Sequence, residues 1–195
     1  MKELRLEDVF RYALSGGIGF VVLLLTYPKA VCSMSYLAAS LGKPEGALGV
    51  TLMLGVVLLT GTVIYNVHRA ATYPIFLRLL GRHLLGAPRE PFWNPWKPSK
   101  FELDLDYWRS GLCDTQRHRW DEWGAQTHSL YCGAWAIFAA LTLGCWFWGL
   151  PNCRAWYMFL FLFFVTWGAA MVTNYRLLYS ITDAKKRDEE KVATR

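Results

Sequence analysis

Four segments of this 195-residue chain lack charged residues entirely, although charged residues make up 18% of the sequence. These charge-free segments are residues 12–27, 47–67, 129–150 and 155–175. A bilayer core of ~30 Å is crossed by about 20 helical residues at ~1.5 Å each, so each of the last three segments is long enough to span it. With 54% hydrophobic residues, the chain is therefore predicted to be an all-α membrane protein, and the composition argues against a soluble domain.

The first charge-free segment is shorter, and it reaches spanning length only if Val9 and Phe10 join it while Arg11 turns its guanidinium toward the headgroups. A cleavable signal peptide is the alternative, because Lys2 and Arg5 precede the apolar stretch. However, the amino end also carries acidic residues, and the stretch ends in TYPKAVC rather than in a clear small-x-small cleavage site. We therefore expect the segment to be retained. The four predicted transmembrane helices then cover residues 9–27, 47–67, 129–150 and 155–175.

Lysine and arginine are scarce on one side of the predicted membrane. Eighteen of the 21 fall in the amino end, in the stretch between the second and third spans and in the carboxyl tail. The positive-inside rule therefore places both termini and this long loop in the cytoplasm, with the protein in the cell inner membrane. The same asymmetry accounts for most of the net charge of +6, so we expect no direct nucleic-acid binding. The predicted parts are a first hairpin (1–67), a cytoplasmic loop (68–128), a second hairpin (129–175) and a charged tail (176–195).

No aspartate or glutamate occurs within any of the four segments. This absence excludes a carboxylate proton relay or cation site of the usual kind in the membrane, and it argues against an ion-coupled transporter. Other polar residues gather at the cytoplasmic ends of the predicted spans. We predict an inner polar layer that consists of Asn66, His68, Arg69, His128, Asn174 and Arg176. The layer is either a gate or ligand site or, more simply, a set of interhelical hydrogen bonds with arginines that reach the headgroups.

The chain has only five cysteines, and the first outer connection holds one of them, Cys32. Membrane oxidoreductases that make disulfides need a cysteine pair in that connection, so the layout argues against this activity. Cys153 lies in the second outer connection, at about the same membrane level as Cys32. We predict a disulfide between Cys32 and Cys153 in the oxidising outer space, with two unrelated thiols as the alternative.

The loop between the second and third spans has about sixty residues, far more than a connection needs. Its first part, AATYPIFLRLLGRHLLG, can lie along the inner leaflet as an amphipathic helix that Pro74 kinks at its start. Four prolines in APREPFWNPWKPSKFE exclude regular helix, and the last part is expected to form a helix that leads into the third span. Tryptophan and arginine are favoured in protein interfaces, although tryptophan also anchors at lipid headgroups. The predicted partner-binding residues are Arg82, Arg89, Trp93, Trp96, Arg117, Arg119, Trp120 and Trp123.

Signs of catalysis are missing: the sequence has no phosphate-cradling glycine loop, Ser-His-Asp set or convincing carboxylate pair. His118 with Glu122, and His128 with Cys132, have helical metal-ligand spacing, but neither pair has a third ligand nearby in the sequence. The segment RLLGRH matches the arginine–histidine spacing of small helical RNases, but its leucines favour a membrane-surface helix. We expect no catalytic residue, no metal, no cofactor and no enzymatic activity.

Small residues cluster in the first two predicted spans and allow helices to approach closely, either within one chain or between copies in a homo-oligomer. The cluster consists of Ser15, Gly16, Gly17, Gly19, Gly55 and Gly61. The leading hypothesis is an oligomeric, non-enzymatic membrane subunit that senses an envelope event, anchors a cytoplasmic partner protein through its loop, or does both.

In architecture alone, the chain resembles the membrane components of bacterial two-part defence systems, which would imply a role in antiviral defence. The alternative is a homo-oligomeric channel or pore that is gated near the inner leaflet. Its layout is similar to that of large-pore four-span channels in topology only.

Overall fold

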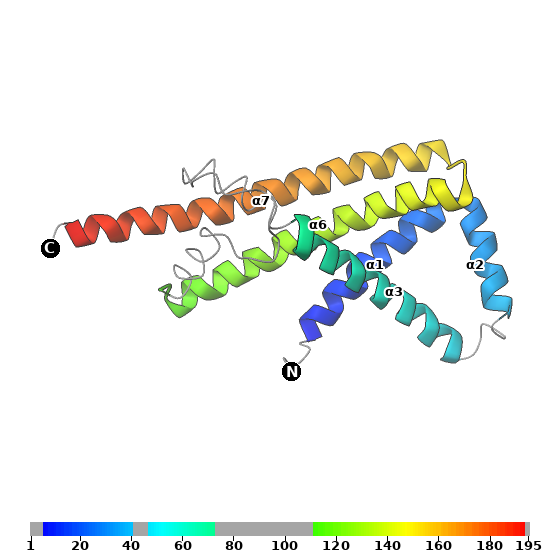
Figure 1. Ribbon diagram of the computed structural model, residues 1–195, viewed down its shortest axis with the longest axis horizontal. Helices are drawn as coiled ribbons and strands as arrows, with labels where there is room; N and C mark the ends of the chain where they lie inside the picture. The colour runs from blue at the N-terminus through cyan, green and yellow to red at the C-terminus, as the bar shows by residue number, and fades with distance from the viewer. Residues whose placement is uncertain (1–5, 41–46, 73–110, 194–195) are drawn as a thin grey trace. The chain divides into compact units, whose positions relative to one another are not determined.

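The structure, a computed structural model, describes residues 6–40, 47–72 and 111–193. These residues form helices α1 (Leu6–Thr26), α2 (Pro28–Ser40) and α3 (Ala47–Val67), the π-helical turn η1 (His68–Thr72), and helices α6 (Asp114–Trp148) and α7 (Cys153–Ala193) (Figure 1). The described part contains helices and no strand, which confirms the predicted all-α class there.

The chain divides into two compact units, and each is described by itself. Unit 1 comprises Met1–Asn66 and Ser129–Gly168, and unit 2 comprises Val67–His128 and Ala169–Arg195. Each unit therefore takes segments from both halves of the sequence.

Three helical stretches of the described residues are long and apolar enough to cross a membrane. They are Met53–Ala70, Asp114–Trp148 and Cys153–Ser180. These stretches agree with a multi-pass membrane protein. The apolar part of α1, Tyr12–Thr26, is shorter, and at ~1.5 Å per residue it falls short of a ~30 Å core. The fourth span and the inward topology thus remain predictions.

The turn between α6 and α7 follows from three adjacent residues. Gly149 ends α6 with a φ of 78°, a left-handed conformation that glycine adopts without a steric penalty, and its N–H donates to the Cys145 carbonyl at 3.2 Å. Pro151 cannot continue the helix. Asn152 then caps α7, because its Oδ1 accepts from the Ala155 N–H at 3.5 Å. Within unit 1 the two helices form the predicted antiparallel pair (Figure 1).

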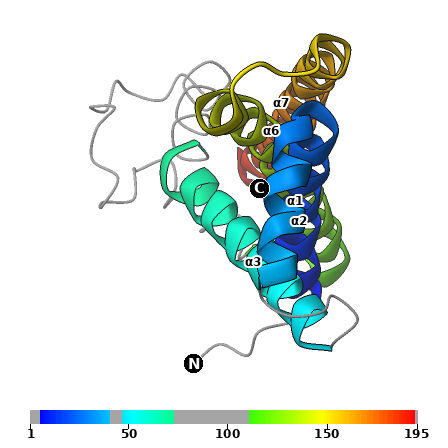
Figure 2. The ribbon, with the colours of Figure 1, turned by 90° about the vertical axis from the view of Figure 1, so that its right-hand side faces the viewer.

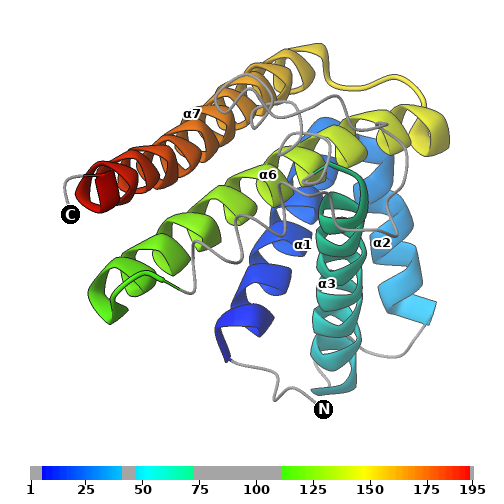
Figure 3. The same cartoon turned by 60° about the vertical axis from the view of Figure 1, so that its left-hand side comes forward.

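Helices α1 and α3 cross in unit 1 (Figures 1 and 3), and two glycines bring their backbones into contact. A Cβ atom on Gly16 would overlap the carbonyl of Val57, and one on Gly61 would overlap the carbonyl of Tyr12. Gly17, the neighbour of Gly16, has no other part of the structure within reach of such an atom. The predicted close approach of helices through small residues therefore occurs within one chain, at Gly16 and Gly61.

The α6–α7 turn lies beside the junction of α1 and α2 (Figures 1 and 2). The Asn152 N–H donates to the Thr26 carbonyl at 2.7 Å, and the Trp148 indole N–H donates to the Ser33 hydroxyl at 3.2 Å. Between them Tyr27, which is fully buried, donates its hydroxyl proton to the Leu141 carbonyl at 2.5 Å. The connection between α1 and α3 begins with a helix, α2, which was not predicted from the sequence.

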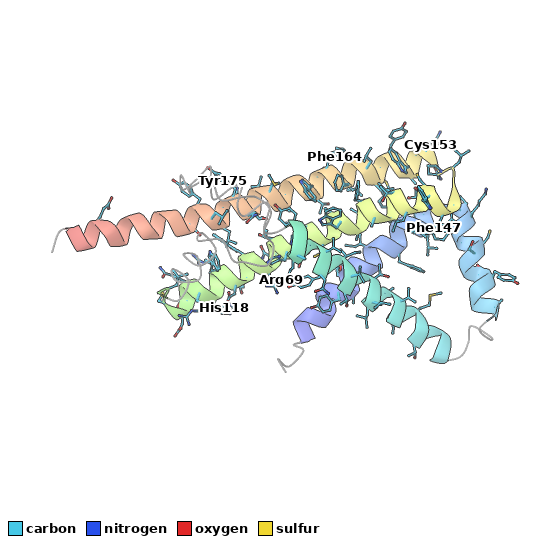
Figure 4. The ribbon with its side chains drawn as sticks, in the orientation of Figure 1. Arg69, His118, Phe147, Cys153, Phe164 and Tyr175 are labelled. Carbon is cyan, nitrogen blue, oxygen red and sulfur yellow. The ribbon has the colours of Figure 1, made fainter. Side chains whose placement is uncertain are left out.

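Helices α6 and α7 differ in how much of their apolar surface is covered. Half of the apolar stretch of α6, 50%, is buried, compared with 11% of that of α7. In unit 1, Phe161 and Phe164 of α7 are 67% and 62% exposed, and Figure 4 labels Phe164 on the outside of that helix. Aromatic side chains this exposed on an apolar helix suit contact with lipid, whereas α6 packs against other helices.

Candidate functional site

Two histidines from distant parts of the sequence meet in unit 2. His68 is the first residue of the π-helical turn that follows α3, and its side chain is fully buried. Its Nε2 lies 2.9 Å from Nδ1 of His128 on α6, and the two rings meet edge to face at 70° with centroids 5.2 Å apart. One nitrogen must donate a proton and the other must accept it, so the pair shares a single hydrogen at this contact. We call this pair the histidine clasp.

Asn174 of α7 is the second polar feature of unit 2. Its side chain is fully buried, and in the described part of the protein neither its Oδ1 nor its Nδ2 has a hydrogen-bond partner. A buried amide without partners costs roughly 1–3 kcal/mol. Thr127, which is also buried, avoids this cost by donating to the Trp123 carbonyl of its own helix at 2.9 Å.

Within unit 2 the structure brings two residues of the predicted inner polar layer together. His68 and His128 are in contact, and Asn174 is buried in the same unit. Arg69 and Arg176 are exposed. Asn66 belongs to unit 1, is exposed, and donates its Nδ2 proton to the Thr62 carbonyl of its own helix at 2.9 Å.

Four of the eight predicted partner-binding residues, Arg82, Arg89, Trp93 and Trp96, lie outside the described residues. The other four lie near the start of α6, in unit 2. Arg119 and Trp123 are exposed there, one helical turn apart on one face. Trp120 is half-buried. Arg117 is also half-buried, donating to the Leu112 carbonyl at 3.2 Å and lying 3.7 Å from the Asp114 carboxylate.

The exposed face around Arg119 and Trp123 also includes Gln116 and Gln126, which follow the same helical spacing. We call these four residues the α6 face. The neighbouring His118 lies 3.6 Å from Glu122, as its four-residue spacing predicted.

The five cysteines are all free in the structure, and Cys32 and Cys153 are both exposed in unit 1. Cys32 lies six residues after Thr26, and Cys153 lies directly after Asn152, the two residues that are joined by a backbone hydrogen bond. Figure 4 labels Cys153 at the start of α7. The disulfide between Cys32 and Cys153 stays a prediction.

The histidine clasp offers two imidazole nitrogens, whereas structural zinc sites use four ligands. Within the described ranges no group of three histidine, cysteine, aspartate or glutamate side chains comes together. The clasp therefore joins two chain segments by a hydrogen bond, but it does not by itself make a metal centre.

Replacing Asn174 with leucine, which has nearly the same shape, is expected to stabilise the protein by about 1–2 kcal/mol, because it removes an unpaired buried amide. The thermal midpoint in detergent measures the change. Asn66→Leu is the matched control: its amide is exposed, so little change is expected. A lower midpoint for Asn174→Leu would mean that the amide has a partner after all.

Sequence reasoning missed the π-helical turn that places His68. Its signal was Pro74, two residues beyond Thr72, which cannot donate the backbone hydrogen bond that an α-helix needs at that point. No protein family, curated protein or solved structure matches the chain, so the function must be argued from its own residues.

Proposed function

We propose that this chain is a non-enzymatic subunit of the cell inner membrane that holds a cytoplasmic partner protein at the membrane and responds to an envelope event. The lengths of α6 and α7 carry the proposal. They have 35 and 41 residues, or about 52 and 61 Å at ~1.5 Å per residue, against a bilayer core of ~30 Å. Each helix therefore has well over a dozen residues more than a membrane crossing requires.

The surplus residues are polar in sequence. The start of α6 reads DTQRHRWDEW, and the end of α7 reads TDAKKRDEEKVA. Both stretches belong to unit 2, together with the histidine clasp. Helices that only crossed the bilayer would not need a charged extension, whereas a protein-docking platform would.

The α6 face is the described surface best suited to a partner. An exposed tryptophan is costly in water and is stabilised when a protein pocket covers it, and arginine is the charged residue most favoured in interfaces. Trp123 is 38% exposed, and Arg119, one helical turn away, is exposed as well. A partner with an apolar pocket and a nearby carboxylate fits this pair.

Changing Trp123 to alanine and Arg119 to glutamate together is expected to reduce the co-purifying partner at least tenfold, because both interface anchors are lost. The measurement is the molar ratio of partner to tagged protein after purification from the native host in mild detergent. Trp146→Ala is the matched control: it removes a tryptophan that is 85% exposed at the opposite end of α6. A stoichiometric partner whose amount is the same in all three proteins would refute docking on the α6 face.

A homo-oligomeric channel is the second candidate, and the buried, unpaired amide of Asn174 favours it, because polar groups at membrane depth usually face protein or water. Current across planar bilayers that contain the purified protein tests this candidate. Loss of the current in Asn174→Leu but not in Asn66→Leu would support a pore. If the purified protein gives no current, the channel is refuted and the membrane anchor remains the proposed function. Membership in a two-part defence system would follow if the partner carries the active chemistry.

A further inference from the structure

Helix α2 begins beside the α6–α7 turn of unit 1 and runs crosswise to α6 and α7 (Figures 1 and 2). Ala30, near its start, is fully buried, and the Ser33 hydroxyl accepts a hydrogen bond from the Trp148 indole at 3.2 Å. The apolar stretch of α6 ends at Trp148, and that of α7 begins at Cys153. Because spanning helices tilt on average only ~20° from the bilayer normal, a helix crosswise to them runs close to the membrane plane.

This end of unit 1 exposes large apolar side chains. Leu150 in the turn, Trp146 on α6 and Tyr36 on α2 are 93%, 85% and 80% exposed, the highest values for large hydrophobic side chains in the described part of the chain. Contact between water and apolar surface of this extent is unfavourable. Tryptophan and tyrosine are instead enriched where lipid headgroups meet water.

The apolar surface of α7 extends to the same end. Tyr157, Phe161 and Phe164 are exposed, and their spacing of four and three residues places them on one face of the helix. This face suits contact with lipid, and at Tyr157 it comes within about one helical turn of Cys153, where α7 begins. The lipid-facing surface of α7 therefore leads to the end of unit 1 at which α2 lies.

The side chains of α2 are distributed as a helix that lies flat on a membrane requires. Ala30 and Ser33 mark the side of α2 that faces α6. At about 100° per residue, Ser35 lies on the opposite side, and Val31 and Tyr36 lie on the two flanks between them. All three of these residues are exposed. The outermost side thus carries a small polar residue, and the flanks carry apolar ones.

We propose that α2 is an interfacial helix that lies flat in the headgroup layer of the bilayer, with Val31 and Tyr36 in contact with lipid. Lys29 is its only charged residue, whereas a helix that stood in water would carry more charge. The Lys29 side chain is exposed and long enough to reach lipid phosphates. Under the predicted topology this is the outer leaflet. The inference rests on the proposed function in one respect, that an envelope event which alters the outer lipids acts at α2.

The depth of α2 in the bilayer tests the proposal. Single spin labels are placed by non-canonical amino acids at Val31, Ser35 or Tyr36 of the full-length protein, which leaves the five cysteines untouched. The protein is studied in nanodiscs of phosphatidylethanolamine and phosphatidylglycerol. Accessibility to oxygen, which concentrates in lipid, and to a nickel chelate, which stays in water, gives the depth of each label. Labels at Val31 and Tyr36 are expected about 5–10 Å into the boundary between headgroups and acyl chains, and a label at Ser35 is expected in water.

Two further labels calibrate the depth scale. Phe161, which is exposed on the apolar stretch of α7, is expected deep in lipid. Gln116, which is exposed in the charged start of α6, is expected in water. Both positions are exposed, so a label there leaves the packing of the helices unchanged.

Three results would overturn the proposal. If all three α2 labels match Gln116, the helix stands in water, and if all three match Phe161, it lies in the bilayer core. If the label at Tyr36 is shielded from both reagents, protein covers it, such as a second copy of the chain. Any other pattern without both flank labels in the headgroup layer counts against the proposal as well. No partner protein is present, so the outcome is separate from docking on the α6 face, which can occur whether or not α2 contacts lipid.

Discussion

Replacing Gly61 with alanine is expected to destabilise the protein by about 3 kcal/mol or more, and Gly61→Val is expected to leave no monodisperse protein. At this position α3 touches α1 through the backbone, and an added Cβ would overlap the carbonyl group of Tyr12. Backbone atoms cannot change rotamer, so the two helices must separate, which costs more than the ~1–3 kcal/mol typical of overpacked side chains. Folded domains have only about 5–15 kcal/mol in total.

Gly16→Ala is expected to have a similar effect, because its Cβ would overlap the backbone of Val57 on the other side of the same crossing. Gly17→Ala on α1 and Gly55→Ala on α3 are the matched controls, since nothing lies within 4 Å of a Cβ at either position. Alanine there is expected to be neutral or to stabilise by up to ~1 kcal/mol through helix propensity. Fluorescence-detected size-exclusion after heating measures all four midpoints. Equal midpoints for Gly61→Ala and Gly55→Ala would show that the crossing does not hold the helices together.

The glycines illustrate what the sequence can and cannot predict. Their presence in the first two apolar segments predicted a close approach of helices, and the structure confirms one. The sequence could not show that Gly16 rather than Gly17 makes the contact, because that depends on how each helix is rotated toward its neighbour. Rotation is set by packing with all the other helices at once and leaves no local pattern in the sequence.

The sequence could not tell, for a related reason, which residues of the predicted inner polar layer are buried. Sequence position along a span gives the depth of a residue in the membrane but not the side of the helix on which it lies. Asn66 and His68 are only two residues apart, yet two residues along an α-helix rotate the side chain by ~200°. His68 is accordingly buried against His128, whereas Asn66 is exposed.

Helix continuity was easier to predict than membrane crossing. The charged start of α6 was expected to be helical, and α6 confirms this over Asp114–Trp148. The charged tail after the fourth segment is helical as well, because α7 runs over Cys153–Ala193. Side-chain contacts four residues apart along the helix, such as His118 with Glu122, suit that form. The first segment differs, because its apolar part is too short for its length to decide whether it spans.

Tyr27→Ala is expected to destabilise the protein by about 3–5 kcal/mol, the range for removing a large buried aromatic ring. Tyr27 is fully buried, its hydroxyl donates to the Leu141 carbonyl and lies 3.1 Å from the Cys145 sulfur, and a Cβ on Gly144 would overlap its ring. Tyr27→Phe keeps the ring and removes only the hydroxyl, so about 1 kcal/mol is expected.

The matched control is Tyr36→Ala on α2, where the ring is 80% exposed and its removal is expected to change little. Thermal midpoints are measured with and without a reducing agent, because the predicted disulfide between Cys32 and Cys153 lies at the same end of unit 1. If Tyr27→Ala is as stable as Tyr36→Ala until reductant is added, the disulfide holds this end together. If Tyr27→Ala is destabilised under both conditions, the buried tyrosine holds it, as its contacts imply.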